Sequence, residues 1–182
     1  MRNRHFIAGV VTMAAAFVPL SHAEVTVQFI EPGEFADLSL SGSTTAGIQR
    51  HITDELTKYL KYLGDNYLPH NHKVDLTFLD IDMGGEYEPW RTPNLTHTRF
   101  IREVYVPRMD LRYVWRDGGG KVLADTRERV SDLNYLMLAD PGYVYNDPLR
   151  YEKAMLRRWF LDRFSASPAA SGAAHGEPGK KP

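Results

Sequence analysis

The chain has 182 residues, of which 43% are hydrophobic and 25% are charged, with no cysteine and a formal net charge of −1. This composition is typical of a globular protein and excludes a collagen-like chain, a disulfide-rich scaffold and a wholly disordered chain. The absence of cysteine also excludes a thiol nucleophile, thiol redox chemistry and an anchor on a lipid-modified cysteine.

The first 23 residues have the layout of a secretory signal peptide. Two arginines precede an uncharged apolar run at residues 6–20, which is shorter than the roughly 20 residues that a membrane-spanning helix needs. Small residues stand at positions −3 and −1 of a cleavage point between Ala23 and Glu24. An uncleaved N-terminal anchor is the alternative. We therefore expect an exported chain, cleaved after Ala23, that keeps no membrane span and no lipid anchor.

Cleavage would leave a single domain followed by a tail. The mature chain would carry 20 basic and 23 acidic residues, a net charge of −3, which argues against a nucleic-acid-binding surface. Residues 165–182 hold Ala, Gly, Ser and Pro but no large apolar side chain, so we predict a disordered tail there. Residues 24–164 remain, enough to bury a core without disulfides.

The first half of this domain contains a helix between two strands. Residues 25–30 form a β-branched run that ends at a Pro-Gly turn. Apolar residues then recur at steps of three and four, which predicts an amphipathic helix that ends near Gly64: Ile48, Ile52, Leu56, Tyr59, Leu60 and Leu63. Residues 73–82 alternate as a strand until Leu79, where the phase changes, so we expect a β-bulge or the end of the strand there.

The second half is predicted to contain three strands and a helix. Residues 100–106 are a candidate strand that Pro107 ends, and residues 109–116 alternate as a half-buried strand. Three glycines then precede residues 121–130, which is typical of a hairpin. Asp147 and Pro148 read as the N-cap and first position of a last helix. Its basic face is interpreted as solvated. The fold class is α+β, a mostly antiparallel sheet of four or five strands packed by two helices.

The strongest candidate for a binding site is the long stretch at residues 84–98. Loops of this length are uncommon in compact domains and often carry function. Trp90 beside Arg91, with Tyr87 and His97 nearby, suits stacking on a sugar or aromatic ring next to a charged hydrogen-bond donor. The alternative is that Trp90 folds back onto the sheet as an apolar plug.

A metal site is the second candidate. Asp80, Asp82 and Glu86 lie close together near two glycines, and carboxylates are calcium ligands, although the spacing is not that of an EF-hand. Such acids also commonly cap turns. We therefore predict no cofactor, with a divalent metal as the alternative. A metal-dependent hydrolase built on these residues would lose thermal stability in a chelator.

Motifs of catalysis are otherwise absent from the sequence. It has no G-x-S-x-G, S-x-x-K or H-E-x-x-H motif, no P-loop and no G-x-G-x-x-G. The question of an enzyme stays open, and the absence of these motifs favours a protein that is not one.

Three segments together point to a family. They are residues 79–86 (LDIDMGGE), 131–136 (SDLNYL) and 147–153 (DPLRYEK), the last followed by Trp159. With the N-terminal strand they resemble an uncharacterised family of secreted proteobacterial proteins, known as domain of unknown function 3016. The resemblance implies a protein exported in a Gram-negative cell, periplasmic or secreted. It brings no activity, cofactor or catalytic residue.

These observations support one leading hypothesis, an exported periplasmic protein that acts as a non-catalytic binding or accessory module of the cell envelope. Its partner would be an envelope protein or a glycan. The metal-dependent hydrolase is the alternative. A third interpretation is a structural protein that self-associates through the open edges of its sheet.

Overall fold

The computed structural model describes residues 22–88, 90, 93–137 and 147–165. The predicted signal peptide and the predicted tail lie almost entirely outside these residues. In chain order the elements are β1 (Glu24–Phe29), η1 (Pro32–Glu34), α1 (Ala46–Tyr67), β2 (Lys73–Asp82), β3 (Glu86–Tyr87), η2 (Pro93–Leu95), β4 (Arg99–Phe100), β5 (Arg108–Arg116), β6 (Val122–Ser131) and α2 (Arg150–Phe164).

Four strands form the main sheet, in the order β1-β2-β5-β6. β1 runs parallel to β2, and the other neighbours are antiparallel. The parallel pair requires a crossover, which α1 supplies. A separate two-stranded ribbon of β3 and β4 follows the end of β2. The predicted α+β class, with its mostly antiparallel sheet and two helices, is confirmed.

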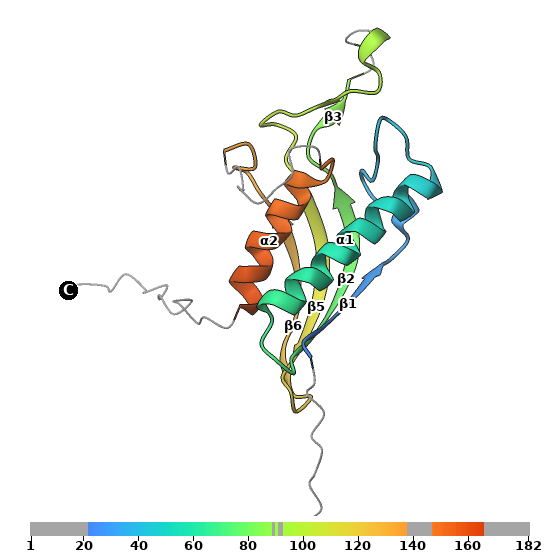
Figure 1. Ribbon diagram of the computed structural model, residues 1–182. Helices are drawn as coiled ribbons and strands as arrows, with labels where there is room; N and C mark the ends of the chain where they lie inside the picture. The colour runs from blue at the N-terminus through green and yellow to red at the C-terminus, as the bar shows by residue number, and fades with distance from the viewer. Residues whose placement is uncertain (1–21, 89, 91–92, 138–146, 166–182) are drawn as a thin grey trace, which may run out of the picture.

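Both helices lie across the same face of the sheet (Figure 1). α1 packs mainly against β1, and α2 packs against α1 and β6. The opposite face carries ion pairs between neighbouring strands, such as Arg112 with Asp125 and Arg129 with Asp110. An antiparallel sheet with one apolar and one polar face gives the period-two pattern seen in the sequence.

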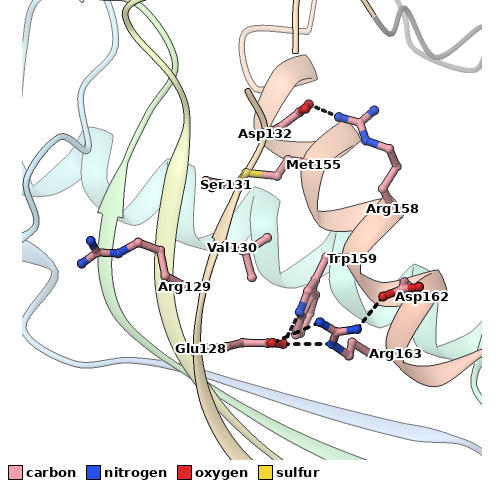
Figure 2. A pocket seen from close by; sticks show the side chains of 10 residues that line it. All are labelled: Glu128, Arg129, Val130, Ser131, Asp132, Met155, Arg158, Trp159, Asp162 and Arg163. Carbon is pink, nitrogen blue, oxygen red and sulfur yellow. Dashed lines mark hydrogen bonds and ion pairs between the residues drawn. The ribbon is translucent and has the colours of Figure 1, made fainter. Parts of the chain in front are cut away.

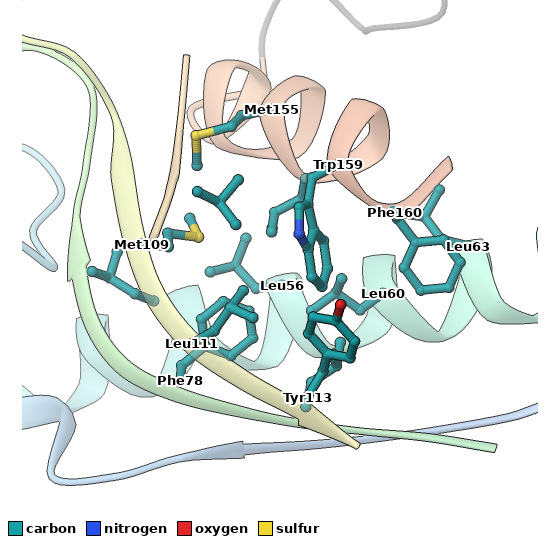
Figure 3. Close-up of a cluster of buried hydrophobic side chains, with 14 of the residues drawn as sticks. Leu56, Leu60, Leu63, Phe78, Met109, Leu111, Tyr113, Met155, Trp159 and Phe160 are labelled. Carbon is teal, nitrogen blue, oxygen red and sulfur yellow. The ribbon is translucent and has the colours of Figure 1, made fainter. Parts of the chain in front are cut away.

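The core fills the space between the helices and the sheet (Figure 3). Leu56, Leu60 and Leu63 of α1 are fully buried, as expected from their three- and four-residue spacing. From α2, Trp159 and Phe164 meet Tyr113 of β5 edge to face, with ring centroids 6.0 and 5.2 Å away. Edge-to-face aromatic contacts add stability beyond the buried area.

The expected bulge in β2 is present. Its register against β5 shifts between Phe78 and Asp80, so that Leu79 has no direct partner. Because of this shift Phe78 and Ile81 both point into the core and are fully buried. The bulge therefore explains the phase change in the sequence.

The predicted strand at residues 100–106 is wrong. Of these residues only Phe100, the last residue of β4, lies in a strand. The backbone turns soon afterwards, where the N–H of Tyr105 donates to the carbonyl of Arg102 at 2.9 Å. An apolar and β-branched composition does not form a strand where no neighbouring strand is in position to pair.

The last helix begins later than predicted, at Arg150, with Leu149 as its N-cap residue. Asp147 still satisfies free donors before the helix, since its side chain accepts from the N–H of Leu149 at 2.8 Å and its carbonyl accepts from Arg150. The Asp-Pro pair therefore forms a turn that leads into the helix.

No helix within the described ranges is both long enough and apolar enough to cross a membrane.

Candidate functional site

Residues 84–107, which we call the arm, leave the main sheet after β2 and return to it at β5. The ribbon of β3 and β4 forms the stem of the arm, with Glu86 opposite Phe100 and Tyr87 opposite Arg99. Figure 1 shows β3 and the segment beyond it standing clear of the end of the main sheet. The long stretch that the sequence singled out, residues 84–98, thus lies within this projection.

Trp90 is an exposed residue of this arm. Its relative exposure is 75%, and Leu95 and Val104 of the same arm are also exposed. The interpretation of Trp90 as an apolar plug beneath the loop is therefore wrong. Arg91 lies outside the described residues. A tryptophan this exposed gains nothing from the core and can supply a large apolar contact to a partner.

Arg99 anchors the arm at its base. Its Nη2 donates to Asp37 Oδ2 at 2.8 Å and to the Ser39 carbonyl at 2.9 Å, and its Nη1 donates to the carbonyls of Gly84 and Gly85 at 3.0 and 3.3 Å. The buried hydroxyl of Ser39 completes the network by donating to Asp37 Oδ1 at 2.5 Å. An ion pair largely withdrawn from water fixes orientation strongly, because its hydrogen bonds have defined directions.

Glu152 of α2 holds the same point of the chain from the other side. It is 1% exposed, and its Oε1 accepts from the N–H of Gly84 at 2.8 Å, while its Oε2 is buried and has no hydrogen-bond partner among the described residues. Burial raises the pKa of this carboxyl group above its ordinary value, although the Gly84 N–H and the charge of Arg99 oppose the increase. The backbone of Gly84 is thus bound by Glu152 at its N–H and by Arg99 at its carbonyl.

Gly85 must be glycine for this arrangement. Its φ is +87°, and a Cβ there would lie 2.6 Å from Ile101 Cδ1 and 2.9 Å from the Phe100 carbonyl oxygen. A residue with a side chain would meet both a strained backbone and the returning strand of the arm. The two adjacent glycines therefore allow the chain to turn out of β2 and into the arm.

A second polar contact closes the arm internally. Glu88 is 3% exposed and accepts from Arg102 Nη2 at 3.1 Å and from the Tyr105 hydroxyl at 2.9 Å. The hydroxyl of Tyr135, which follows β6, donates to the Arg102 carbonyl at 2.6 Å. The arm is thus held together and to the body by directed hydrogen bonds at several points along its stem.

A hollow of about 390 Å³ lies where the arm meets the body. Two residues of the predicted binding site, Tyr87 and His97, line it together with Arg99, whereas Trp90 does not. His97 Nδ1–H donates to the Ser41 carbonyl at 2.9 Å. The other walls come from the segment before α1 and from the first turn of α2. The structure therefore does not bring the predicted residues to one site. Tyr87 and His97 line the hollow, whereas Trp90 is exposed elsewhere on the arm. Arg91 lies outside the described residues.

The predicted metal-binding carboxylates each have a partner in the protein. Asp80 Oδ1 accepts from the Ala36 N–H at 2.8 Å, Asp82 pairs with Arg108 at 2.6 Å, and Glu86 accepts from the Tyr87 N–H at 2.9 Å. Burial raises the pKa of Asp82, and the neighbouring carboxylates add to the increase. In the part of the chain that the structure describes, no three His, Asp or Glu side chains are grouped to hold a metal ion. Metal binding stays a prediction.

A second hollow, of about 360 Å³, lies between β6 and α2 (Figure 2). Glu128 of β6 accepts from Trp159 Nε1 at 2.5 Å and from Arg163 Nε at 3.3 Å, and Arg158 pairs with Asp132. These contacts correct the interpretation of the basic face of α2 as merely solvated. Lys153 on the same helix is buried against Asp147 and Glu55.

Sequence reasoning missed Arg99, Asp37 and Glu152, which fix the arm. Arg99 and Asp37 are separated by 62 residues, and Glu152 and Gly84 by 68. The one local signal was the glycine pair at positions 84 and 85, which marks a place where the chain must turn sharply.

Comparison with known proteins adds the family. The model of a family described as "Protein of unknown function (DUF3016)" matches residues 23–162, from the end of the predicted signal peptide to the last turn of α2. No curated protein matches the chain. Since the match covers most of the chain, including both helices and the whole arm, the protein belongs to the DUF3016 family.

Proposed function

We propose that the protein is exported to the periplasm and acts there as a non-catalytic binding module of the cell envelope, with the arm as its contact surface. The observation that carries the proposal is the exposure of Trp90 on a projection whose base is fixed by buried polar contacts. Tryptophan is among the residues that contribute most to binding at protein interfaces.

The fixed base matters because a partner need not order the base of the arm when it binds. Ordering a flexible segment reduces affinity, whereas a surface held in place before binding avoids that cost. The contacts with Glu152 and Arg99 hold the base of the stem at both the N–H and the carbonyl of Gly84. Leu95 and Val104 are further exposed apolar residues of the arm.

An envelope protein is the partner that these observations favour. A glycan site would need its aromatic and polar groups around one concavity, yet Trp90 does not line the hollow that holds Tyr87 and His97. A projecting tryptophan instead suits insertion into a pocket on a protein partner.

Export is supported by the apolar run and small residues of the first 23 positions. Cleavage after Ala23 would also leave β1 whole, since that strand begins at Glu24.

Replacement of Trp90 by alanine tests the binding surface. Tagged Trp90→Ala, wild-type and Tyr62→Ala chains are used to capture proteins from solubilised envelope, and the captured proteins are quantified by mass spectrometry. Tyr62 is the matched control, an exposed aromatic residue on α1. We expect the Trp90 variant to lose a partner that the other two retain, by about 30-fold if the residue contributes about 2 kcal/mol, with an unchanged melting temperature.

Equal capture by all three chains would contradict the proposal. Binding to purified peptidoglycan that is lost in Tyr87→Ala and His97→Ala, but kept in Trp90→Ala, would instead favour a glycan bound in the hollow.

A further inference from the structure

β6 forms an open edge of the main sheet. Within the described ranges it pairs with β5 and with no strand on its other side. The register against β5 is regular from Ala124 to Ser131, and the one shift, between Trp115 and Arg116 of β5, leaves Leu123 of β6 with no directly opposed residue on β5. The strand contains neither proline nor glycine. Such an edge presents alternate N–H and C=O groups that another strand can bind.

We propose that this edge binds a second copy of the chain, with two β6 strands antiparallel about a two-fold axis at Thr126. An antiparallel pair places directly opposed side chains on the same face. With the axis at Thr126, Asp125 of each copy lies opposite Arg127 of the other, and the two Thr126 residues face each other. The two sheets then join into one sheet, with all helices on the same side.

Among two-fold axes at residues 125–129, the charges of β6 favour the one at Thr126. An axis at Arg127 or Arg129 would oppose each arginine to its own copy, and an axis at Glu128 would oppose Arg127 to Arg129 as well as Glu128 to itself. Like charges directly opposed across strands are destabilising, whereas opposite charges stabilise the pair. An axis at Asp125 would oppose two carboxylates. The Thr126 axis opposes no like charges along the regular part of β6.

The neighbouring contacts are compatible with this pairing. Glu128 lies opposite Ala124 of the other copy, and the small side chain leaves room for it. Glu128 is also held against α2 by Trp159 and Arg163, so it does not project across the edge (Figure 2). On the opposite face Asp125 is oriented by two bonds from Arg112, at 2.8 and 2.6 Å, and Arg127 of the second copy would extend this row of alternating charges.

The pairing has a consequence for the arm. The arm lies at the end of the sheet where β6 finishes (Figure 1). Antiparallel pairing would place the two arms at opposite ends of the joined sheet. The dimer would therefore present two separate contact surfaces. This inference does not rest on the proposed binding function, because no residue of the arm lies in β6.

A single cysteine tests the register directly, because the natural chain has none. Opposed Cα atoms in an antiparallel pair lie about 4.5–5.5 Å apart, within the range of a disulfide. We expect the full-length Thr126→Cys chain to form a covalent dimer under mild oxidation. Leu123→Cys is the matched control on the same strand, since its two copies would lie roughly 20 Å apart, and it should stay uncrosslinked.

Charge reversal gives an independent measurement by light scattering. Wild-type chain should be dimeric, Arg127→Asp should shift it toward monomer by opposing two carboxylates, and the double variant Asp125→Arg/Arg127→Asp should restore the dimer. Arg50→Asp, the same change on the exposed side of α1, should remain dimeric. A monomeric wild-type chain overturns the inference. So does a dimer in which Thr126→Cys crosslinks no faster than Leu123→Cys, because that dimer would use another surface.

Discussion

At the scale of single residues, the base of the arm depends on a buried carboxyl group. One oxygen of Glu152 accepts from the Gly84 N–H, and the other has no hydrogen-bond partner in the part of the chain that the structure describes. A charged carboxylate without full compensation is costly in the interior, so burial favours its protonated form. This is the physical reason for its raised pKa, and it makes the anchor of the arm sensitive to pH.

Glu152→Gln should remove this sensitivity. Because the pKa is higher in the folded than in the unfolded chain, the folded chain binds more protons above the ordinary value of 4.5. The free energy of unfolding of the wild type therefore falls as the pH rises above that value, until the pH passes the raised pKa. The glutamine can still accept from Gly84 but has no charge to bury. The stability of the Glu152→Gln variant should therefore vary less with pH and should exceed that of the wild type near neutrality.

The measurement is urea unfolding of both chains at about pH 5 and about pH 8. The free energy of unfolding should fall between these pH values in the wild type and change less in Glu152→Gln. Glu34→Gln, at an exposed glutamate, is the control and should follow the wild-type profile. If the free energy of unfolding changed with pH in the same way in Glu152→Gln and the wild type, Glu152 would not be the source of the pH dependence.

At the scale of elements, the approach of α1 to β1 depends on Gly64. A Cβ at this position would lie 2.3 Å from Val25 Cγ2, closer than side chains pack. β1 is short and pairs only with β2 among the described strands. Its position on the sheet therefore depends on close contact with the helix.

Gly64→Ala should destabilise the fold although alanine favours helix. The propensity gain is about 1 kcal/mol, but overpacking against Val25 costs typically about 1–3 kcal/mol. Gly47→Ala is the matched control in the same helix, since nothing lies within 4 Å of a Cβ there, and it should be neutral or stabilising by up to about 1 kcal/mol. Urea unfolding compares the two, and a stabilised Gly64→Ala would show that the helix and strand can separate without cost.

At the scale of the whole molecule, the start of the domain coincides with the predicted cleavage point. The backbone nitrogen of Glu24 donates to the His72 carbonyl at 3.0 Å. After cleavage this nitrogen would become the terminal ammonium group, which can still donate the same hydrogen bond. Removal of the first 23 residues should therefore leave β1 in place.

Expression in a Gram-negative host tests this directly. We expect the chain recovered from the periplasm to have the mass of residues 24–182. Ala23→Leu should block processing because position −1 must be small, whereas His22→Leu at position −2 should be processed normally. A full-length chain in the cytoplasm would contradict export, and intact mass spectrometry distinguishes the outcomes.

Local periodicity was sufficient to predict most elements. The spacing of apolar residues predicted α1, the alternation predicted β2 and β5, the glycine turn predicted β6 as the second strand of a hairpin, and the change of phase at Leu79 predicted the bulge. These patterns are visible because each residue's burial depends on its place in a regular helix or strand. The same reasoning failed at residues 100–106, where composition suited a strand but only Phe100 lies in one.

By itself, the sequence determined the class of fold, the family resemblance and the stretch that became the arm. Only the tertiary structure decided that Trp90 is exposed rather than buried. It alone decided that Arg99 meets Asp37, that Glu152 meets Gly84 and that β1 joins the sheet parallel to β2. Periodicity reports whether a residue is buried, whereas partners distant in sequence are chosen by how the elements pack in space.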